Sequence, residues 1–572
     1  MTPETEQQYK NQIAALQAEI EKLKNQQTKA IQREKYGLNW IDVPEEFDEK
    51  SKNSIPVLKE IKEKAIKNDD GKPTHILIEG DNYHALTCLN YTHAGKIDVI
   101  YIDPPYNTGS DGFTYKDARF MTEFPNGKTV PKDDPLRHST WLSFMEKRLR
   151  LAKNLLSDKG VIFISIDDNE QANLKLLCDR IFGEKNFVNQ FIWQRNSSGK
   201  TEKDKFTINS EYVLFYKKSD LCILNSAYKP LAESTKALYK RDDNDGRGKY
   251  RLYPLQKPAS PGPETTYDYV DNNGKVWKCP PKGWRIKQSK LKELENDGRL
   301  CLENSTLSEK AYWNERESEG KRIDTLWTDL PENTVGTSQL SELFENKVVF
   351  SNPKPTELIR RCLQINTKKA TILDFFAGSG TTLHATMKLN AEDGGNRQCI
   401  LVQQKENDAN ICETITYERN RRVMQGYTNA KGEEIAGLGN SLKYYKTDFI
   451  GKNKPEKATD EDRISLAQKA GFLISLVENT LEKIETNDFY QIFSDAEENQ
   501  FTAIYFNGDT EKFPDFVQSI QEKNKKTTVY IFTWGSPDIF ENEFDDLSNI
   551  TIKSIPQPIL EIYKSLMKNE EQ

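Results

Sequence analysis

The chain has 572 residues, of which 36% are hydrophobic and 30% are charged, and its formal net charge is −7. A length in this range predicts roughly two to four domains of a soluble globular protein. No stretch offers ~18 consecutive apolar residues, so the sequence predicts no helix that crosses a membrane.

The net charge conceals a division along the chain. Residues 195–300 carry 22 Lys and Arg against 14 Asp and Glu, whereas residues 455–572 carry 11 against 23. This contrast indicates that the basic middle and the acidic final region meet different partners, although solvated surfaces without a binding role would give the same counts.

Cysteine usage and the first residues predict the compartment. The eight cysteines show no CxxC or Cys/His spacing, which argues against a zinc site or a disulfide framework. The stretch MTPETEQQYKNQ has neither a basic region nor an apolar core, so no secretory signal is expected. We therefore expect a cytoplasmic protein without a metal site.

Residues 1–40 contain a helical pattern of apolar residues. Ile13, Leu16, Ile20 and Leu23 follow the spacing of a short coiled coil within a segment rich in Gln, Glu and Lys. At about three heptads, the pattern fits a dimer contact and a helix packed on its own domain equally well.

Residues 41–218 alternate between strand and helix patterns from residue 75 onward. The apolar runs HILIEG, KIDVIYID and GVIFISID are predicted to be strands, and the segments that follow them have helical periodicity. Alternation of this kind predicts a Rossmann-like α/β fold with a mainly parallel, doubly wound sheet.

The second of these strands ends in the sequence Asp103-Pro104-Pro105-Tyr106. The prolines lack N–H donors and hold their carbonyl groups in place, the aspartate adds acceptor oxygens, and the tyrosine supplies a flat aromatic face. Two acceptors and a ring suit a planar group that bears an exocyclic amine, such as a nucleobase extruded from a double helix. The alternative is a strand-terminating turn with a capping aspartate.

Residues 219–345 keep neither period and combine Pro, Gly, Tyr and Trp with basic residues. This composition predicts an inserted domain of short strands and loops. Trp277 and Trp284, in the stretch VWKCPPKGWRIKQ, are expected in its core and not at a binding surface.

The α/β pattern returns over residues 346–450, in the stretch TILDFFAGSGTTLHA. A strand ending at Asp374 is followed by Phe376, Ala377, Gly378 and Gly380. The glycines allow a tight turn and a close approach to a ligand at the carboxyl end of a strand, where open α/β sheets bind nucleotides. An ordinary strand–helix turn would have the same sequence features. No Gly-Lys-Ser/Thr follows, so ATP hydrolysis is not expected.

Residues 451–572 are acidic but contain further helix and strand patterns, in SLAQKAGFLISLVENTLEKI, FTAIYFNG and TTVYIFTWG. They are predicted to form a separate small α/β domain and not a disordered tail. This region is a candidate for contacts between subunits.

The order of DPPY, insert and FAGSG resembles that of β-class DNA amino-methyltransferases. More narrowly, it resembles the modification (Mod) subunit of type III restriction–modification systems. The matching stretches lie within residues 75–420 and are ILIEGDNYHAL, DVIYIDPPYNTGSDGFTYKD, HSTWLSFMEKRLRLAKNLLSDKGVIFISIDDNEQANLKLLCDRIFG, SEYVLFYKK, NPKPTELIRRCL and DFFAGSGTTLHA. The insert would then be a target-recognition domain.

The resemblance implies S-adenosylmethionine as the methyl donor and adenine N6 of a flipped base in double-stranded DNA as the acceptor. Asp103 and the Pro104 carbonyl would hold the amine, and Tyr106 would stack on the base. Lys354 would hold the methionine end of the cofactor, and Gln403 stands where many methyltransferases place an acid for the ribose. The implied catalytic residues are Asp103, Pro104, Pro105 and Tyr106, and the implied cofactor residues are Asp81, Asp103, Lys354, Pro355, Asp374, Phe376, Ala377, Gly378, Gly380, Thr381 and Gln403.

The resemblance also implies partners. Relatives act as dimers and assemble with a separate restriction (Res) subunit that carries the ATPase and the nuclease. Three alternatives stay open: methylation of cytosine N4, which is also an exocyclic amine, a methyltransferase without a restriction partner, and a DNA-specificity subunit without turnover. The intact DPPY and FAGSG motifs argue against the last.

Overall fold

The computed structural model describes residues 16–17, 37–45, 53–109, 118–198, 206–224, 228–229, 231, 233–257, 262–302, 306–319, 321–365, 367–405, 410–429, 431–533, 537–545, 547 and 549–568. The predicted helix near the start of the chain therefore lies outside the described residues, apart from 16–17. The chain divides into two compact units, Met1–Asn225 with Thr325–Gln572 and, inserted between them, Ser226–Asp324. Within the described ranges, no helix is long and apolar enough to cross a lipid bilayer.

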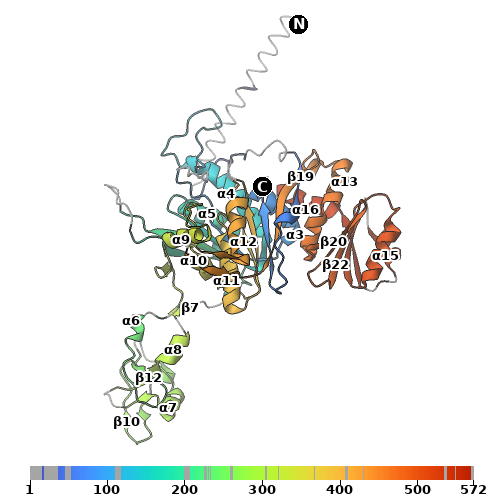
Figure 1. Ribbon diagram of the computed structural model, residues 1–572. Coiled ribbons are helices and arrows are strands. Elements are labelled where there is room, and N and C mark those ends of the chain that lie inside the picture. The colour runs from blue at the N-terminus through green and yellow to red at the C-terminus, as the bar shows by residue number, and fades with distance from the viewer. Residues whose placement is uncertain are drawn as a thin grey trace. The chain divides into compact units, whose positions relative to one another are not determined.

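The first unit is built around a large twisted sheet (Figure 1). Ten strands from the described part of this unit form it, in the order β1 (Ile55–Glu60), β19 (Ser441–Ile450), β2 (Thr74–Glu79), β16 (Gln398–Gln403), β15 (Thr371–Asp374), β3 (Ile97–Ile102), β4 (Leu156–Ile166), β6 (Ser210–Lys217), β5 (Phe187–Gln194) and β14 (Leu326–Trp327).

The central part of the sheet is parallel. Strands β19, β2, β16, β15, β3 and β4 all run the same way, whereas β1 and β6 run antiparallel to their neighbours. Val, Ile and Leu fill the central strands because both faces of a parallel sheet are covered by helices. The predicted α/β class with a doubly wound, mainly parallel sheet is confirmed.

Helices cover the sheet on two faces, because the chain moves across it in opposite directions. It passes from β2 to β3 to β4 through α3 (Asn82–His93) and α4 (Ser139–Leu155), but moves back from β15 to β16 through α11 (Thr381–Asp393). Right-handed crossovers therefore place α3 and α4 on one face and α11 on the other. Helix α5 (Gln171–Phe182) packs beside α4, and α10 (Thr356–Leu363) and α12 (Glu418–Gln425) pack beside α11.

The final region forms a second sheet with its own helix, which confirms the predicted small α/β part. Its strands follow the order β20 (Glu482–Thr486), β21 (Tyr490–Ser494), β22 (Gln500–Tyr505), β23 (Lys526–Phe532) and β24 (Ile550–Ile555), with α15 (Phe513–Lys523) on one side. Helices α13 (Asp460–Lys469), α14 (Gly471–Glu478) and α16 (Gln557–Lys568) complete it.

The small sheet shares a hydrophobic core with the large one. Helices α14 and α16 both pack on α3, and Leu473 and Ile559 are buried in the same cluster as Leu86. The hydroxyl of Tyr563 on α16 donates to the carbonyl of Pro56 on β1 at 3.1 Å. The acidic region is thus anchored to the large sheet by apolar packing, and it belongs to the same compact unit instead of forming the separate domain that was predicted.

The second unit consists of short strands and loops, as expected. Its main sheet has the order β11 (Leu300–Cys301), β12 (Ser308–Tyr312) and β8 (Tyr250–Pro254), beside α7 (Gln288–Asn296). Trp277 and Trp284 lie in its core with Leu291, at exposures of 6%, 2% and 0%, which confirms the prediction for both tryptophans.

This unit is shorter than the predicted insert. The prediction assigned residues 219–345 to one recognition domain, whereas the compact unit covers residues 226–324. Strand β14 pairs with β5 of the large sheet, and α9 (Asn333–Leu343) belongs to the first unit. Other described elements are the ribbon of β7 (Tyr228–Lys229) with β13 (Lys321–Arg322), the pair β9 (Tyr269–Val270) and β10 (Val276–Trp277), the pair β17 (Gly426–Thr428) and β18 (Glu434–Ala436), α6 (Glu233–Lys236), α8 (Trp313–Glu319) and a π-helical turn at Cys412–Tyr417.

Candidate active site

The predicted site residues gather at one edge of the large sheet. Strands β2, β16, β15 and β3 are consecutive neighbours and parallel, so the loops at their carboxyl ends leave the same edge. The loop at Asp103–Tyr106 follows β3, and the loop at Phe376–Gly380 follows the adjacent β15. The two motifs, far apart in the sequence, therefore lie side by side.

Asp103, Tyr106 and Lys354 form one hydrogen-bonded cluster. The Tyr106 hydroxyl donates to Asp103 Oδ1 at 2.7 Å, and Lys354 Nζ donates to Asp103 Oδ2 at 2.9 Å. Lys354 Nζ also lies 2.8 Å from the Tyr106 hydroxyl and 5.0 Å from the centre of its ring. Lys354, predicted from the sequence as a cofactor residue, thus contacts the predicted catalytic residues directly.

A second carboxylate, Glu211, completes this cluster and was missed by the sequence analysis. It lies on β6 and is 3% exposed, with Oε2 at 3.3 Å from Lys354 Nζ and 3.2 Å from the Tyr106 hydroxyl. Its other oxygen accepts from Arg195 Nη1 at 3.0 Å. Glu211 lies in the stretch SEYVLFYKK, one of those that resemble the methyltransferase family. That resemblance predicts a strand but assigns no role to Glu211.

The cluster shifts the pKa values of its members in different directions. Burial raises the pKa of Asp103 above its ordinary value, although the ammonium of Lys354 acts to lower it. Burial acts the same way on Glu211, but Lys354 and Arg195 outweigh it, so the pKa of Glu211 lies below its ordinary value. Burial lowers the pKa of Lys354, yet the two carboxylates reverse this and raise it. Glu211 is therefore the more firmly ionised of the two acids.

The backbone after Asp103 is fixed by its neighbours. Trp141 Nε1 donates to the Pro105 carbonyl at 2.8 Å, whereas the Pro104 carbonyl forms no hydrogen bond with the described part of the chain. Asn107 takes a left-handed conformation at φ 58° and donates to Glu170 Oε1 at 2.6 Å. The Pro104 oxygen thus remains available as an acceptor beside Asp103.

Lys354 is held in place by α9, although the sequence analysis assigned that segment to the insert. A Cβ built on Gly336 of α9 would lie 2.0 Å from the Pro353 carbonyl oxygen, so only glycine permits this approach. Gln339 Oε1 accepts from the backbone N–H of Thr356 at 3.0 Å, just after Pro355, which caps α10. Helix α9 therefore supports the loop that carries Lys354.

The Gly378–Gly380 loop approaches its surroundings too closely for a side chain. Both glycines have positive φ, 51° and 77°, and a Cβ on Gly380 would lie 2.4 Å from Asn420 Nδ2. Gln403, 4% exposed at the end of β16, accepts from the N–H of Gly378 at 2.7 Å, and the N–H of Ala377 donates to the Val402 carbonyl. Gln403 thus fixes the loop through its side-chain oxygen.

Asp374 and Thr381 also hold this loop from inside. Asp374, 2% exposed, accepts from the N–H of Phe376 at 3.0 Å and from the Thr382 hydroxyl at 2.5 Å. Burial raises the pKa of Asp374 to about 7. The Thr381 hydroxyl accepts from the buried guanidinium of Arg419 at 2.6 Å, and burial lowers the pKa of Arg419 to about 9.

Asp81 begins α3 at the same edge of the sheet. Its Oδ1 accepts from the N–H of Tyr83 at 2.8 Å, an N-cap, and its Oδ2 lies 3.5 Å from Arg148 Nη2. Arg148 binds Glu45 through both terminal nitrogens, at 2.8 and 2.7 Å, and its guanidinium lies 3.7 Å from the centre of the Phe144 ring. The Phe144 ring is 5.9 Å from that of Phe376, which links the Asp81 and glycine loops.

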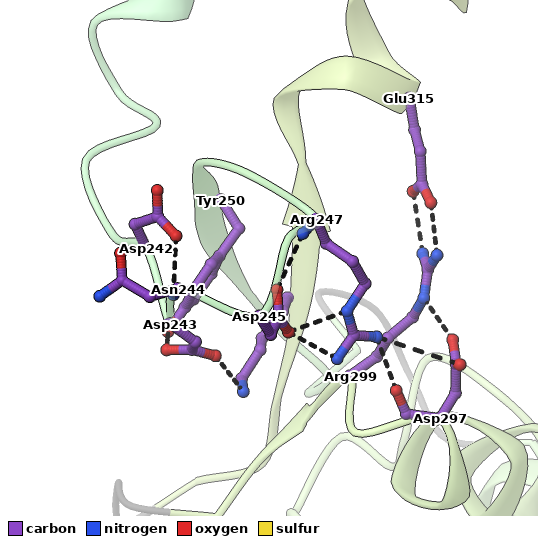
Figure 2. Close-up of polar contacts among 10 residues, drawn as sticks. Asp242, Asp243, Asn244, Asp245, Arg247, Tyr250, Asp297, Arg299 and Glu315 are labelled. Carbon is purple, nitrogen blue, oxygen red and sulfur yellow. Dashed lines mark hydrogen bonds and ion pairs between the residues drawn. The ribbon is translucent and has the colours of Figure 1, made fainter.

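In the second unit, several basic residues are neutralised internally. Figure 2 shows Arg247 between Asp245 and Asp297, and Arg299 between Asp297 and Glu315. Arg247 Nη2 lies 2.8 Å from Asp245 Oδ2, and Arg299 Nη1 donates to Glu315 Oε2 at 2.8 Å. Charges held in such pairs contribute little to an external potential.

Arg251 lies on the other face of the same small sheet. Arg251 pairs with Ala311 in the register of β8 with β12. Successive side chains of a strand point to opposite faces, so Arg251 lies on the face opposite to Tyr250, which belongs to the network in Figure 2. Its guanidinium is 4.3 Å from the centre of the Tyr253 ring, and among the described residues no carboxylate forms an ion pair with it. A cation on an aromatic ring is a combination that nucleic-acid surfaces use.

The arrangement at the sheet edge has a definite chemistry. Asp103 and the Pro104 carbonyl offer acceptors for an amine, Tyr106 offers an aromatic face, and the neighbouring glycine loop offers backbone close to a ligand. Within the described ranges, no group of three or more His, Cys, Asp or Glu is placed to hold a metal ion.

Comparisons with known proteins identify DNA methylases as relatives of this chain. The model of a family described as DNA methylase, covering N6 and N4 enzymes, matches residues 97–425. The StyLTI Mod subunit, a type III restriction–modification enzyme of Salmonella typhimurium, is 36% identical over 384 residues, 62% of this chain and 58% of that protein. The EcoPI Mod subunit of Escherichia phage P1 is 32% identical over 66% of this chain and 64% of that protein. The matched region thus spans less than two thirds of either Mod subunit.

Two further proteins extend the comparison. The type II methyltransferase M.KpnI of Klebsiella pneumoniae is 34% identical over 405 residues, which make up 65% of this chain and 90% of that protein. Among solved structures, a DNA modification methylase of Thermus thermophilus in complex with S-adenosyl-L-methionine aligns with 65% of this chain and 99% of its own, at 14% identity and a TM-score of 0.31.

Proposed function

The chain belongs to the N6/N4 DNA methylase family, and from this premise we propose that it transfers a methyl group from S-adenosylmethionine to adenine N6 in double-stranded DNA. The observation that carries the proposal is the pairing of β3 with β15, which sets the Asp103–Tyr106 loop beside the Gly378–Gly380 loop. One loop suits an extruded base and the other suits a cofactor, so the donor and the acceptor would meet between them.

The residues around the glycine loop fit this cofactor. A Cβ on Gly378 would lie 3.2 Å from the Phe350 ring and one on Gly380 would lie 2.4 Å from Asn420, so both glycines let the loop pack against the chain's own side chains and hold its backbone at the carboxyl end of β15, where a nucleotide-like cofactor would bind. Phe376 and Asp81 lie at the same edge and would contact the ligand from the ends of β15 and β2. When bound, S-adenosylmethionine supplies a sulfonium methyl group that is already strongly electrophilic.

The chain's own residues would then position the amine. Asp103 and the Pro104 carbonyl accept its two N–H groups, which favours a pyramidal nitrogen and spreads the positive charge that develops during transfer. Tyr106 stacks on the base that has left the helix. The same contacts would hold the nitrogen towards the methyl group that the cofactor supplies, and positioning of this kind is worth several kcal/mol.

We further propose that the protein is the Mod subunit of a type III system, acting as a dimer with a Res subunit. The two Mod relatives support this assignment. A methyltransferase without a restriction partner is the second candidate, because M.KpnI, a type II methyltransferase, is matched over 90% of its length. Light scattering of the purified chain, alone and with the product of any neighbouring restriction gene, separates the two.

A single assay tests the reaction. The full chain is incubated with tritiated-methyl S-adenosylmethionine and duplex DNA, and the modified nucleosides are identified by mass spectrometry. N6-methyladenine is expected, N4-methylcytosine would assign the other amine, and no transfer to any DNA would leave a specificity subunit without turnover. Single-molecule sequencing of DNA from a host that expresses the chain then reports the site and the strand.

A further inference from the structure

Both carboxylate oxygens of Asp103 are already engaged by the chain itself. Oδ1 accepts from the Tyr106 hydroxyl at 2.7 Å and Oδ2 accepts from Lys354 Nζ at 2.9 Å. The proposed function assigns one of these oxygens to the amine of the target base. Each oxygen keeps a second lone pair, but an acceptor whose charge is already compensated by an ammonium stabilises the developing charge of the amine less, so the amine gains most if Lys354 withdraws.

Glu211 is the acceptor to which both donors can turn. Its Oε2 lies 3.3 Å from Lys354 Nζ and 3.2 Å from the Tyr106 hydroxyl, slightly farther than the Asp103 oxygens. Arg195 holds the opposite oxygen of the same carboxylate at 3.0 Å, so Glu211 stays in place when the cluster rearranges. A carboxylate that is 3% exposed is costly to bury unless it is paired in this way.

We propose that Glu211 is a positioning residue that takes over Lys354 and the Tyr106 hydroxyl when a base enters, so that Asp103 can accept the target amine. This inference rests on the proposed function. Before entry, one ammonium is shared by two carboxylates. After entry, the ammonium remains with Glu211, and an N–H of the base replaces it at Asp103. No covalent bond changes in this step.

The proposal predicts a change in the pH profile of methyl transfer. The acid limb reports ionisation of Asp103, because its carboxylate must accept the amine. The charge of Glu211 raises the pKa of Asp103, so removal of that charge lowers it. Removal of Glu211 also leaves Lys354 paired with Asp103 alone, which lowers the pKa of Asp103 further. The charged or titratable groups that face the two acids are Tyr101, Tyr106, Asp167, Arg195, Lys354 and Asp374.

The test uses the full chain and the variants Glu211→Gln and Glu211→Asp. For Glu211→Gln, single-turnover methyl transfer at neutral pH is expected to fall by at least ~10-fold, with S-adenosylmethionine affinity within about twofold. Its acid limb is expected to move to lower pH. Glu211→Asp, which keeps the charge, is expected to recover part of the rate and the wild-type acid limb.

Glu60→Gln is the matched control. Glu60 is also a buried carboxylate paired with a lysine, with Oε1 at 3.1 Å from Lys443 Nζ, but it lies on β1 at the edge of the sheet. Its loss removes a buried ion pair without touching Asp103. Thermal unfolding of every variant reports the cost in stability, and the acid limb of Glu60→Gln is expected to match that of the wild type.

Two results would overturn the role of Glu211. One is a Glu211→Gln protein with the wild-type rate, and the other is a slower protein whose acid limb has not moved, which would indicate structural support alone. Absence of transfer by the wild-type chain would instead refute the proposed function, so the two failures are distinguishable.

Discussion

Lys354 Nζ lies 2.9 Å from Asp103 Oδ2, although the two are 251 positions apart in the sequence. The contact joins the loop after β3 to the loop before α10, and the whole second unit lies between them in the chain. The site therefore exists only when both halves of the first unit have folded around the same sheet.

Replacement of Asp103 tests the centre of this cluster. Asp103→Ala is expected to reduce methyl transfer by at least ~10³-fold, because it removes the acceptor that orients the amine, whereas cofactor affinity should weaken by less than ~10-fold. Tritium transfer and titration calorimetry with S-adenosylmethionine measure the two effects. A variant with full turnover would refute the assignment of Asp103.

The two ends of α11 offer a matched pair of glycines. Gly380 and Gly394 flank the helix with φ of 77° and 66°, but a Cβ on Gly380 would strike Asn420, whereas nothing lies within 4 Å of one on Gly394. Gly394→Ala is expected to cost ~1 kcal/mol of unfolding free energy from its backbone conformation alone.

Gly380→Ala is expected to cost ~2–4 kcal/mol and to weaken S-adenosylmethionine binding by at least ~10-fold, because the loop must move. Denaturant unfolding and calorimetry on both variants measure the difference. Equal behaviour of the two would mean that the close approach of Gly380 does not shape the cofactor loop.

The parts of the site that could be predicted from the sequence are those with local signals. Prolines at 104 and 105 and glycines at 378 and 380 mark turns wherever they occur, and the apolar runs before them mark strands. The sheet then brings these loops together because parallel strands share a carboxyl edge.

Glu211 and the role of α9 could not be predicted, because their signals are not local. Glu211 reaches the cluster only because β6 lies next to β4, and no pattern within its strand specifies that neighbour. No helical pattern persists over residues 219–345 in the sequence, so α9 falls within the predicted insert, although its Gly336 is what lets it approach the backbone beside Lys354.

Removal of the second unit tests its predicted role in site recognition. Strands β7 and β13 pair near its two ends, with Lys229 opposite Lys321, so a short Gly-Ser linker can replace residues 226–324. This variant is expected to bind S-adenosylmethionine within about threefold of the wild type but to lose site-selective methylation.

A longer deletion provides the contrast. Removal of residues 225–340 also takes Gly336 and Gln339 of α9, so it is expected to abolish methyl transfer as well as selectivity. Sequencing of methylated DNA and calorimetry measure both properties. Retention of site-selective methylation by the shorter deletion would contradict a recognition role for the second unit.

Two arginines of the second unit should behave differently towards DNA. Arg299 is held by Asp297 and Glu315, whereas Arg251 stacks on Tyr253 (Figure 2 shows the Arg299 network). Arg251→Ala is expected to weaken DNA binding and to reduce the slope of log affinity against log salt by about 1.

Arg299→Ala is expected to leave that slope unchanged and to lower the thermal stability of the protein slightly, because its ion pairs with Asp297 and Glu315 are lost. Fluorescence anisotropy at several salt concentrations and thermal unfolding measure the two effects. A reduced salt slope for Arg299→Ala would show that its ion pairs open to bind phosphate.

The raised pKa of Asp374 predicts an unusual dependence of stability on pH. Burial moves this pKa from 3.8 to about 7, so folding favours the neutral acid. The stabilising contribution is fully present below the unfolded pKa and is lost as pH rises to about 7, on the order of 3–4 kcal/mol over this range.

Asp374→Asn keeps an acceptor for the Phe376 N–H and a polar group beside Thr382, but it does not ionise. The unfolding free energy of the variant minus that of the wild type, both measured by urea titration, should therefore increase steadily between pH 4 and pH 7. A constant difference across this range would mean that Asp374 ionises in the folded protein as it does in the unfolded chain.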